Sequence, residues 1–259
     1  MRIQTPEIAP ICKPGQFLML KCGKDALLRR PISVNSVIDS TCLELLYALP
    51  NKIDDTDYSM RLGCETEIRT AKGMGTLWLS GLKKGSSLDL VGPSGNGFTI
   101  DSAANKLLLI AGGIGIAPLR FLAEFALLQG KDVTLLLGAR TKAGIIPDNL
   151  LPAGVKVVLA TEDGSLGKKD TIINLVPEYI DWADQVFACG PKAMYQALDK
   201  QMKTYPRERN VQVSLEVRMG CGTGICYSCS IKTKQGMKRV CKEGPVFNIR
   251  DIIWQEVVT

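Results

Sequence analysis

Four cysteines near the C-terminus have the spacing of iron ligands. They are Cys221, Cys226, Cys229 and Cys241. The first three form a C-x4-C-x2-C pattern on one short loop, and the fourth follows after a further loop. This is the plant-type spacing of thiolates that hold a [2Fe–2S] cluster. Glycines in the same loop let backbone N–H groups turn inward toward the sulfurs, so the sequence predicts a two-iron site here.

A structural zinc site with four cysteines is the alternative. Zinc ribbons usually carry two C-x2-C pairs. This segment contains a single pair of that spacing, Cys226 and Cys229, so the pattern favours iron over zinc. The scattered cysteines of the first half of the chain are expected to be ordinary small side chains. They are Cys12, Cys22, Cys42 and Cys64.

A glycine-rich turn could bind a dinucleotide. Residues 106–111 have the pattern of a buried strand, and residues 118–128 alternate with a helical period. Gly112, Gly113 and Gly115 stand between them. Such a turn presents backbone N–H groups and the N-terminal dipole of the helix to a pyrophosphate. We expect these three glycines to contact NAD; a plain tight turn is the alternative.

A second turn is expected to complete the dinucleotide site. Cys189, Gly190 and Pro191 follow a predicted strand and precede a predicted helix. Dinucleotides bind at the carboxyl ends of parallel strands, where this turn would lie. Arg140 follows the second strand of the pattern, where an acidic residue would grip the ribose of NADH. Arg140 would attract a 2′-phosphate or be a solvated loop charge, so the residues leave NADH and NADPH both open.

The chain of 259 residues contains no histidine. This excludes Cys/His zinc sites, Ser-His-Asp triads and Cys-His dyads, together with the usual acid or base near neutral pH. No catalytic side chain is therefore expected, and a cofactor would supply the chemistry. The hydrophobic content of 46% predicts a well-packed globular protein. The net charge of +6 is spread along the chain without a basic block, which argues against a nucleic-acid partner.

The sequence pattern predicts neither a membrane-spanning helix nor a signal peptide. Its apolar runs are far shorter than the roughly 20 residues of a membrane-spanning helix. The first residues lack the apolar region of a signal peptide. We therefore predict a cytoplasmic protein without a membrane partner.

The elements that must position these residues change character along the chain. Short strands broken by Gly and Pro predict an antiparallel β-barrel in the first hundred residues; they cover residues 16–22, 41–49 and 87–91. Strand–helix alternation then predicts a doubly wound parallel α/β sheet; its strands cover residues 106–111, 132–138, 156–160 and 185–189, and a helix covers residues 193–203. A last strand, residues 211–216, precedes the cysteines. We expect three domains, residues 1–100, 101–210 and 211–259.

The order of these motifs resembles the ferredoxin reductase family. Arg30, Pro31, Ile32 and Ser33 are similar to its flavin-binding R-P-x-S motif. Residues 92–98, Gly-Pro-Ser-Gly-Asn-Gly-Phe, resemble the end of its barrel. The glycine turn and Cys-Gly-Pro follow in the family's order. The C-terminal cysteine segment, which ends in residues 240–247, narrows the resemblance to the electron transfer subunits of dihydroorotate dehydrogenase B.

The resemblance implies an FAD-binding barrel, an NAD-binding α/β domain and a small [2Fe–2S] domain. Arg30 and Ser33 would hold the FAD. Residues Leu46, Tyr47 and Ala48 resemble the next flavin-contacting strand. Gly75 and Thr76 would approach the FAD pyrophosphate through backbone N–H groups. The cluster would be held by Cys221, Cys226, Cys229 and Cys241.

The resemblance also implies a partner. NADH would reduce the FAD, and electrons would leave singly through the cluster to the FMN of a dihydroorotate dehydrogenase catalytic subunit, in a heterotetramer with two copies of each chain. Another dehydrogenase or a ferredoxin as the electron acceptor is the nearest alternative. A non-catalytic adaptor with a sensing cluster or a structural zinc is the alternative from another class.

Three departures from the family are visible. The family usually has a further barrel strand before the turn at Pro14, so we expect that this barrel is incomplete. An arginine is common in the family where Ala48 stands, and Arg69 is a candidate to replace it. Residues 50–72 form a longer stretch than expected, which we interpret as an inserted loop that shifts the alignment around Gly75.

Overall fold

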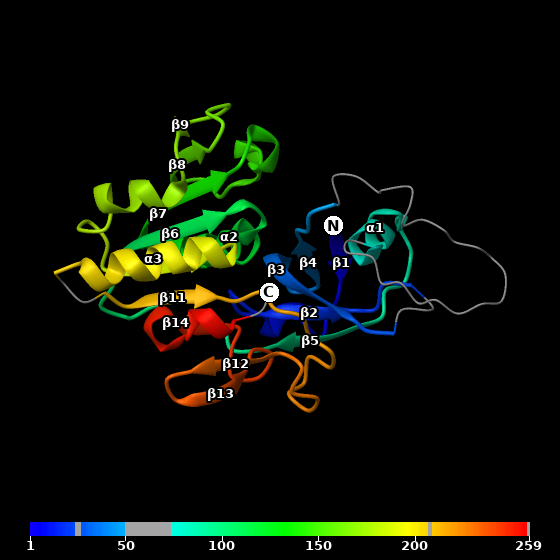
Figure 1. The fold of residues 1–259 in the computed structure, drawn as a ribbon. Coiled ribbons are helices and arrows are strands. Elements are labelled where there is room, and N and C mark those ends of the chain that lie inside the picture. The colour runs from blue at the N-terminus through cyan, green and yellow to red at the C-terminus, as the bar shows by residue number, and fades with distance from the viewer. Residues whose placement is uncertain (24–26, 50–73, 207–208, 258–259) are drawn as a thin grey trace.

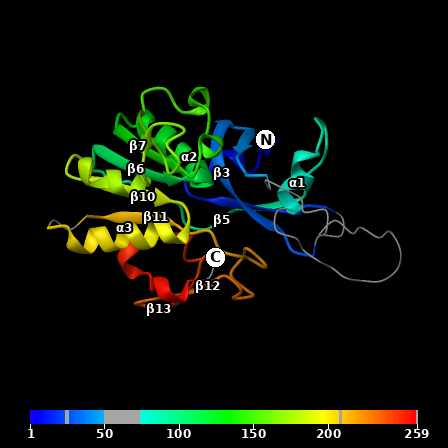
Figure 2. The same ribbon diagram turned by 45° about the horizontal axis from the view of Figure 1, so that its top comes forward.

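The computed structural model describes residues 1–23, 27–49, 74–206 and 209–257. Two large sheets and a small hairpin organise this part of the chain. In Figure 1 the parallel sheet with its helices is on the left, the antiparallel sheet is on the right, and the orange and red C-terminal segment lies beneath them. Figure 2 shows the same three parts from a second direction. In the described residues, no helix is long and apolar enough to cross a membrane.

The antiparallel sheet, which we call the half-barrel, curls around its own apolar core. Its strand order is β1-β4-β3-β2-β5, with all neighbours antiparallel. The strands are β1 (Arg2–Gln4), β2 (Phe17–Leu20), β3 (Arg30–Asp39), β4 (Cys42–Leu45) and β5 (Leu90–Ser94). The expected antiparallel architecture is confirmed. Among the described residues, β1 and β5 do not pair with each other, so the sheet stays open between these two edges.

Strand β2 shows why this sheet can serve two cores. Successive side chains of a strand point to opposite faces. Leu18 and Leu20 accordingly pack inside the half-barrel. Phe17 and Met19 face the other way and belong to the core that continues into the C-terminal part of the chain. All four side chains are buried, so β2 is a shared wall between the half-barrel and the rest of the protein.

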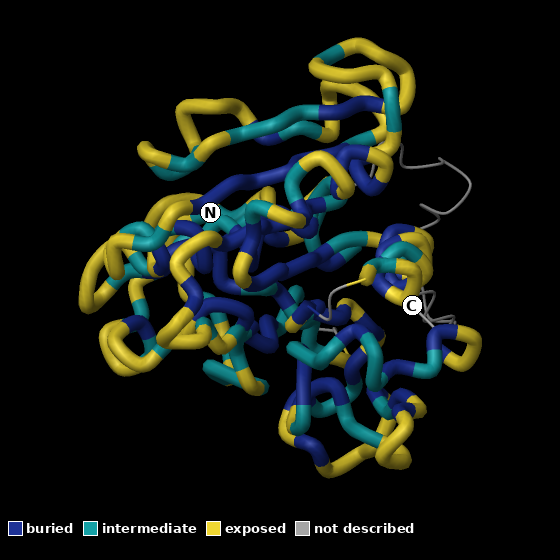
Figure 3. Tube along the Cα trace, turned by 90° about the vertical axis from the view of Figure 1, so that its left-hand side faces the viewer, coloured by how far each residue is buried: buried dark blue, intermediate teal, exposed yellow. Residues whose placement is uncertain are grey.

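The parallel sheet has helices and turns on both faces. Its order is β14-β11-β10-β6-β7-β8-β9, and only β14 is antiparallel to its neighbour. The strands are β6 (Lys106–Gly112), β7 (Asp132–Ala139), β8 (Lys156–Thr161), β9 (Lys168–Lys169), β10 (Gln185–Cys189), β11 (Val211–Ser214) and β14 (Val246–Asn248). The covering helices are α2 (Ile116–Leu128) and α3 (Lys192–Thr204). This confirms the predicted doubly wound sheet, whose central strands form the dark blue interior in Figure 3.

The alternation along β6 explains the two layers. Leu108 and Ile110 pack in the core that contains α3, whereas Leu107 and Leu109 pack in the core that contains α2. All four are completely buried. A central strand of a parallel sheet must be apolar on both faces, which is why the sequence of residues 106–111 shows no polar alternation.

The C-terminal segment is joined to the parallel sheet. Strands β11 and β14 are neighbours at its edge, with Val213 opposite Phe247. Strands β12 (Ser230–Thr233) and β13 (Gly236–Arg239) form a separate hairpin between them. The segment from β11 onward, which we call the cluster segment, therefore shares one core with the parallel sheet. The division of the chain at residue 211 stays a prediction.

Several elements differ from their predicted bounds. Strand β4 ends at Leu45, whereas the expected strand continued to residue 49. Residues 46–49 leave the ladder, and Leu46 turns into the core beneath α2. Strand β5 extends to Ser94, three residues beyond the expected end. The helix α1 (Met74–Ser80) was not predicted. The proposed inserted loop at residues 50–72, with Cys64 and Arg69, lies outside the described residues.

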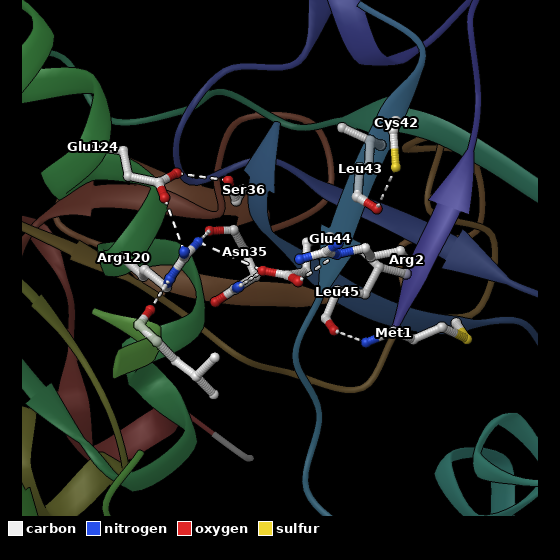
Figure 4. A network of polar contacts seen from close by, with 11 residues as sticks. Met1, Arg2, Asn35, Ser36, Cys42, Leu43, Glu44, Leu45, Arg120 and Glu124 are labelled. Carbon is white, nitrogen blue, oxygen red and sulfur yellow. Dashed lines mark hydrogen bonds and ion pairs between the residues drawn. The ribbon is translucent and has the colours of Figure 1, made fainter. Parts of the chain in front are cut away.

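A charged network joins the half-barrel to the α/β part of the protein (Figure 4). Arg120 on α2 forms ion pairs with Glu124 at 2.9 Å and with Glu44 of β4 at 3.7 Å. Its guanidinium also donates to the carbonyl oxygen of Asn35 in β3. The hydroxyl of Ser36 donates to Glu124 at 2.6 Å. One side chain on α2 is therefore bonded to two strands of the half-barrel.

Candidate flavin, nicotinamide and iron–sulfur site

The four predicted cluster cysteines lie as two pairs. The thiols of Cys221 and Cys226 interact with each other, and so do those of Cys229 and Cys241. Cys221 also acts electrostatically on Cys241, so the two pairs are neighbours. No three Cys, Asp or Glu side chains of the described ranges converge to hold one metal ion. Two irons with two thiolates each fit this arrangement better than one zinc with four.

The loop of residues 220–229, which we call the cluster loop, turns its backbone toward the sulfurs. Gly222 and Gly224 have φ values of +73° and +84°, where a side chain would be strained. Tyr227 adopts φ 59° without being a glycine. The N–H of Thr223 donates to the sulfur of Cys221 at 3.4 Å. The Thr223 side chain first, and then backbone N–H groups of the loop, favour the thiolate and lower the pKa of Cys221 to about 5, which suits a metal ligand.

The second pair of cysteines is buried. Only 3% of the surface of Cys229 and of Cys241 is exposed. The N–H of Cys241 donates to the sulfur of Cys229 at 3.4 Å. Burial raises the pKa of Cys241 to about 12, because a thiolate without a cation is costly in an apolar site. Bound iron would supply the missing positive charge.

Arg239 supports the cluster loop through contacts with Gly224 and Tyr227. This role was not identified by the sequence analysis. The guanidinium of Arg239 donates to the carbonyl oxygen of Gly224 at 2.8 Å and lies 4.7 Å from the ring centre of Tyr227. Arg239 also pairs with Glu243 and thereby lowers the pKa of that carboxyl to about 2. Nothing in the cysteine spacing indicates this role, because Arg239 reaches back across the β12–β13 hairpin.

The cluster loop packs directly on the half-barrel. A Cβ atom added to Gly222 would lie 2.3 Å from Cγ of Met19, so the glycine is needed for this close approach. Met19 pairs with Pro31 across the β2–β3 ladder. The loop that carries the cluster ligands therefore touches the strand next to the predicted flavin motif. Residue 96 strengthens the join, because the amide of Asn96 donates to the carbonyl oxygens of Lys242 and Glu243.

Three of the predicted flavin residues lie near Cys22, namely Arg30, Gly75 and Tyr47. Arg30 begins β3, and Pro31, Ile32 and Ser33 follow it on the same strand. A Cβ atom on Gly75 would lie 2.9 Å from Cγ of Arg30 and 3.4 Å from Cβ of Cys22. Gly75 and Thr76 lie in the first turn of α1. The cationic Arg30 beside this turn fits a phosphate.

The three residues after β4 are less uniform. Tyr47 packs against the core of the half-barrel, and its hydroxyl lies near the thiol of Cys22, which places it with Arg30 and Gly75. Leu46 packs instead against the core of the α/β part. Ala48 is exposed. Their roles toward FAD stay predictions, and Arg69 is outside the described residues.

The two turns predicted to bind NAD lie side by side. Strands β6 and β10 are parallel neighbours with Ala111 opposite Cys189, so both turns leave the same end of the sheet. A Cβ atom on Gly112 would lie 2.8 Å from Pro191. A Cβ atom on Gly113, which has φ +54°, would meet nothing within 4 Å. The turn is therefore closed toward the protein and open toward solvent, as a pyrophosphate site requires.

Replacing Gly115 by alanine tests how the two turns fit. A Cβ atom there would lie 2.1 Å from the carbonyl oxygen of Cys189, so the turns must separate. Gly115→Ala is expected to weaken NAD⁺ binding at least about tenfold and to lower the free energy of unfolding by about 1–3 kcal/mol. Calorimetric titration with NAD⁺ and urea denaturation measure the two effects. Gly81→Ala is the control, because its Cβ would lie at an ordinary 3.4 Å from Trp78.

Glu216 is a further acidic group at this site that the sequence did not single out. It follows β11, and its charge acts on the buried thiol of Cys189. Part of the residue reaches solvent, while burial of its carboxyl raises the pKa of that group above the ordinary 4.5. Its position five residues before Cys221 gave no signal in the sequence.

The raised pKa of Glu216 predicts a pH dependence. The folded protein binds this proton more tightly than the unfolded chain, so the resulting stabilisation is complete below pH 4.5 and is lost as pH rises through the folded pKa. Glu216→Gln removes the titration. Its melting temperature should match that of the wild type in acid and exceed it increasingly toward neutral pH. A constant difference between the two proteins across this range would contradict the assignment.

Known proteins are similar to this chain over nearly its whole length. The model of the iron–sulfur cluster binding domain of dihydroorotate dehydrogenase B matches residues 216–253. A protein of Desulforamulus reducens named dihydroorotate dehydrogenase B (NAD(+)), electron transfer subunit, is 37% identical over 98% of this chain and 92% of its own length. One of the same name from Streptococcus pneumoniae strain R6 is 33% identical over 95% of this chain and 90% of its own. This chain belongs to the family of dihydroorotate dehydrogenase B electron transfer subunits.

Solved structures support the same family fold. An NADH-dependent reduced ferredoxin–NADP oxidoreductase, studied for flavin-based electron bifurcation, superposes with a TM-score of 0.78 at 25% identity, covering 98% of this chain and 84% of its own. A ferredoxin–NADP⁺ reductase from Neisseria gonorrhoeae with bound FAD and NADP superposes with a TM-score of 0.59 at 18% identity, over 82% of this chain and 89% of its own. The second likeness is one of fold.

Proposed function

We propose that this chain is the electron transfer subunit of a dihydroorotate dehydrogenase B. It binds FAD, one [2Fe–2S] cluster and NADH, and it carries electrons between the nicotinamide and a catalytic partner subunit in pyrimidine biosynthesis. The partner contains FMN, and two copies of each chain form a heterotetramer. NADH is the proposed nucleotide, because relatives that are 33% to 37% identical carry NAD(+) in their names.

The observation that carries this proposal is the contact of the cluster loop with the flavin motif. Met19 of β2 contacts Gly222 of the cluster loop and pairs with Pro31 of the flavin motif. Strand β10, which leads into the Cys189 turn, is joined to the segment after the half-barrel, because the ring of Phe187 packs edge-on against Phe98 with ring centres 5.6 Å apart. Electron transfer requires that its centres be close, and residues far apart in the sequence satisfy this only in the folded chain.

The residues of the chain have distinct tasks in this function. Arg30 and the N–H groups of the first turn of α1 hold the phosphates of FAD. The glycine turn and the Cys189 turn hold the nicotinamide nucleotide at the end of the parallel sheet. Two buried and two more accessible thiolates hold the irons. When bound, FAD and the cluster together convert hydride transfer into one-electron transfer, which these side chains cannot supply.

The outer face of the cluster loop is the proposed exit for electrons. Ile225 and Tyr227 are 79% and 63% exposed, although both are large and hydrophobic. The N–H of Ile225 nevertheless points inward and donates to Cys221. The sulfur between them, Cys226, is also exposed. One face of the loop thus lies on the half-barrel through Gly222, and the other presents an apolar surface of the kind that anchors a partner.

Substituting this surface tests where the catalytic subunit binds. Ile225→Ser is expected to weaken binding of the FMN-containing subunit by about tenfold, because central apolar anchors contribute most of the affinity. Met237→Ser is the matched control, since Met237 is also 63% exposed but belongs to β13 of the hairpin rather than to the cluster loop. Titration calorimetry measures both. Equal affinities for the two variants would place the partner elsewhere.

Anaerobic reconstitution tests the function itself. The purified chain, supplied with FAD, iron and sulfide, should show flavin and iron–sulfur absorbance and should oxidise NADH with ferricyanide. With the FMN subunit it should form a complex of two copies of each chain and reduce NAD⁺ with dihydroorotate. A colourless protein, or one that holds zinc in place of iron, would refute the proposal. Reduction of a ferredoxin in preference to the FMN subunit would replace the partner and keep the cofactors.

A further inference from the structure

Tyr195 lies directly beneath the predicted nicotinamide site. It is on the first turn of α3, the helix that follows the Cys189 turn, and only 1% of its surface is exposed. Its hydroxyl accepts the N–H of Gly190 at 2.9 Å and donates to the carbonyl oxygen of Ser214 at 2.5 Å. A buried hydroxyl that both accepts and donates is fixed in direction, so it fixes both backbones that it touches.

The same hydroxyl also lies against the thiol of Cys189. The Cys189 side chain is completely buried, and the side chains of Tyr195 and Ser214 are its hydrogen-bonding neighbours. Burial raises the pKa of this thiol well above its ordinary value, so Cys189 is neutral. The position of the thiol and of the following turn therefore depends on one phenol group rather than on a charge.

Tyr195 connects this turn to the cluster segment. Ser214, its acceptor, is the last residue of β11. The next residue, Leu215, donates its N–H to the carbonyl oxygen of Pro245 at 2.9 Å. The ring of Tyr195 stacks on Trp254 with centres 5.2 Å apart and planes 19° apart. The side chain thus stands between the nucleotide turn and the part of the chain that carries the cluster ligands.

We propose that Tyr195 is a positioning residue for the nicotinamide. Its hydroxyl holds the turn of residues 189–191 against β11, and this sets where the nucleotide lies relative to the half-barrel. This inference rests on the proposed NADH site and adds to it a residue outside the glycine and Cys-Gly-Pro motifs. Without the hydroxyl, the N–H of the half-buried Gly190 and the carbonyl oxygen of the buried Ser214 lose their partner, and the turn relaxes.

Tyr195→Phe separates the hydroxyl from the ring. The variant keeps the stack on Trp254 and loses both hydrogen bonds. In the reconstituted protein, the dissociation constant for NAD⁺ is expected to rise about tenfold by calorimetry, with a similar rise in KM for NADH. Flavin and iron–sulfur absorbance should stay at wild-type levels. Hydrogen exchange at the amide of Gly190 should become faster, which is a readout independent of activity.

Two controls distinguish positioning from general stability. Trp254→Phe disturbs the stack and keeps the hydroxyl, so its melting temperature should fall while its NAD⁺ affinity stays that of the wild type. Tyr179→Phe removes a hydroxyl elsewhere in the fold, where the Tyr179 ring lies 5.4 Å from the Nζ atom of Lys156, the first residue of β8. It should leave both the NAD⁺ affinity and the exchange of Gly190 unchanged.

The outcomes are separable from those of the proposed function. If the wild-type protein fails to bind NAD⁺, the NADH site itself is wrong. If the wild type binds and Tyr195→Phe binds equally well, the positioning role of Tyr195 is overturned. If the variant fails to fold, hydrogen exchange in the wild-type protein still tests the proposal. Rapid exchange of the Gly190 amide in the absence of NAD⁺ would show that the hydroxyl does not hold this turn.

Discussion

Replacing Cys229 by serine is expected to abolish the [2Fe–2S] cluster while the flavin stays bound. Cys229 is buried, pairs with Cys241 and accepts its N–H, so an oxygen in place of sulfur removes one of the four thiolates. Loss of outer partners of metal ligands alone typically costs 10–100-fold in affinity, and losing a ligand should cost more than about 100-fold. Iron and sulfide analysis, with the iron–sulfur absorbance, measures the result.

In the Cys229→Ser variant, the activity that needs only the flavin should persist and the activity that needs the cluster should be lost. NADH oxidation with ferricyanide needs the flavin and should persist, whereas electron delivery to the proposed FMN subunit would need the cluster and should stop. Cys42→Ser is the matched control, because Cys42 is a free cysteine on β4 of the half-barrel. It should keep the cluster and both activities. Wild-type iron content in Cys229→Ser would remove this residue from the ligand set.

The four cysteines proposed as cluster ligands and the turns proposed to bind NAD are visible in the sequence because their geometry is local. Three of the four cysteines are within nine residues of each other, and the glycine turn connects consecutive elements. The period of residues 106–111 and 118–128 likewise sufficed for β6 and α2. Only spacing and burial along the chain are needed for such predictions.

The residues that join the parts could not be predicted in this way. Met19 and Gly222 meet across two hundred residues of sequence, and Tyr195 reaches Ser214 from another element. Arg239 supports the cluster loop through a carbonyl group, which carries no sequence signature. These contacts depend on how the sheets pack. A pattern of hydrophobicity determines which faces are buried, and it does not determine which residues on those faces touch.

Strand β4 shows that sequence patterns also fail to determine where an element ends. The apolar run of residues 41–49 predicts one long strand, but the chain leaves the ladder after Leu45. Leu46 fills the core beneath α2, whereas Tyr47 stays in the half-barrel core. The competition between two neighbouring cores, rather than local propensity, ends this strand.

Replacing Arg120 by methionine should destabilise the join between the half-barrel and the α/β part. Methionine keeps much of the volume and removes the charge, which leaves Glu44 and Glu124 without their shared cation. Breaking a buried ion pair typically costs 3–5 kcal/mol. These two carboxylates are 21% and 26% exposed, so we expect the free energy of unfolding to fall by about 2–4 kcal/mol. Urea denaturation measures the change.

Arg2→Met is the matched control for this network. Arg2 pairs with the same Glu44 at 3.2 Å, but its side chain is 70% exposed. An exposed pair contributes at most about 1 kcal/mol, so this variant should be nearly as stable as the wild type. Flavin reduction by NADH should also slow in Arg120→Met and stay normal in Arg2→Met, because the proposed FAD and nicotinamide sites lie on opposite sides of the join. Equal losses in both variants would show that Arg120 contributes only surface charge. A stable Arg120→Met protein with slow hydride transfer would instead show that the network sets geometry more than stability.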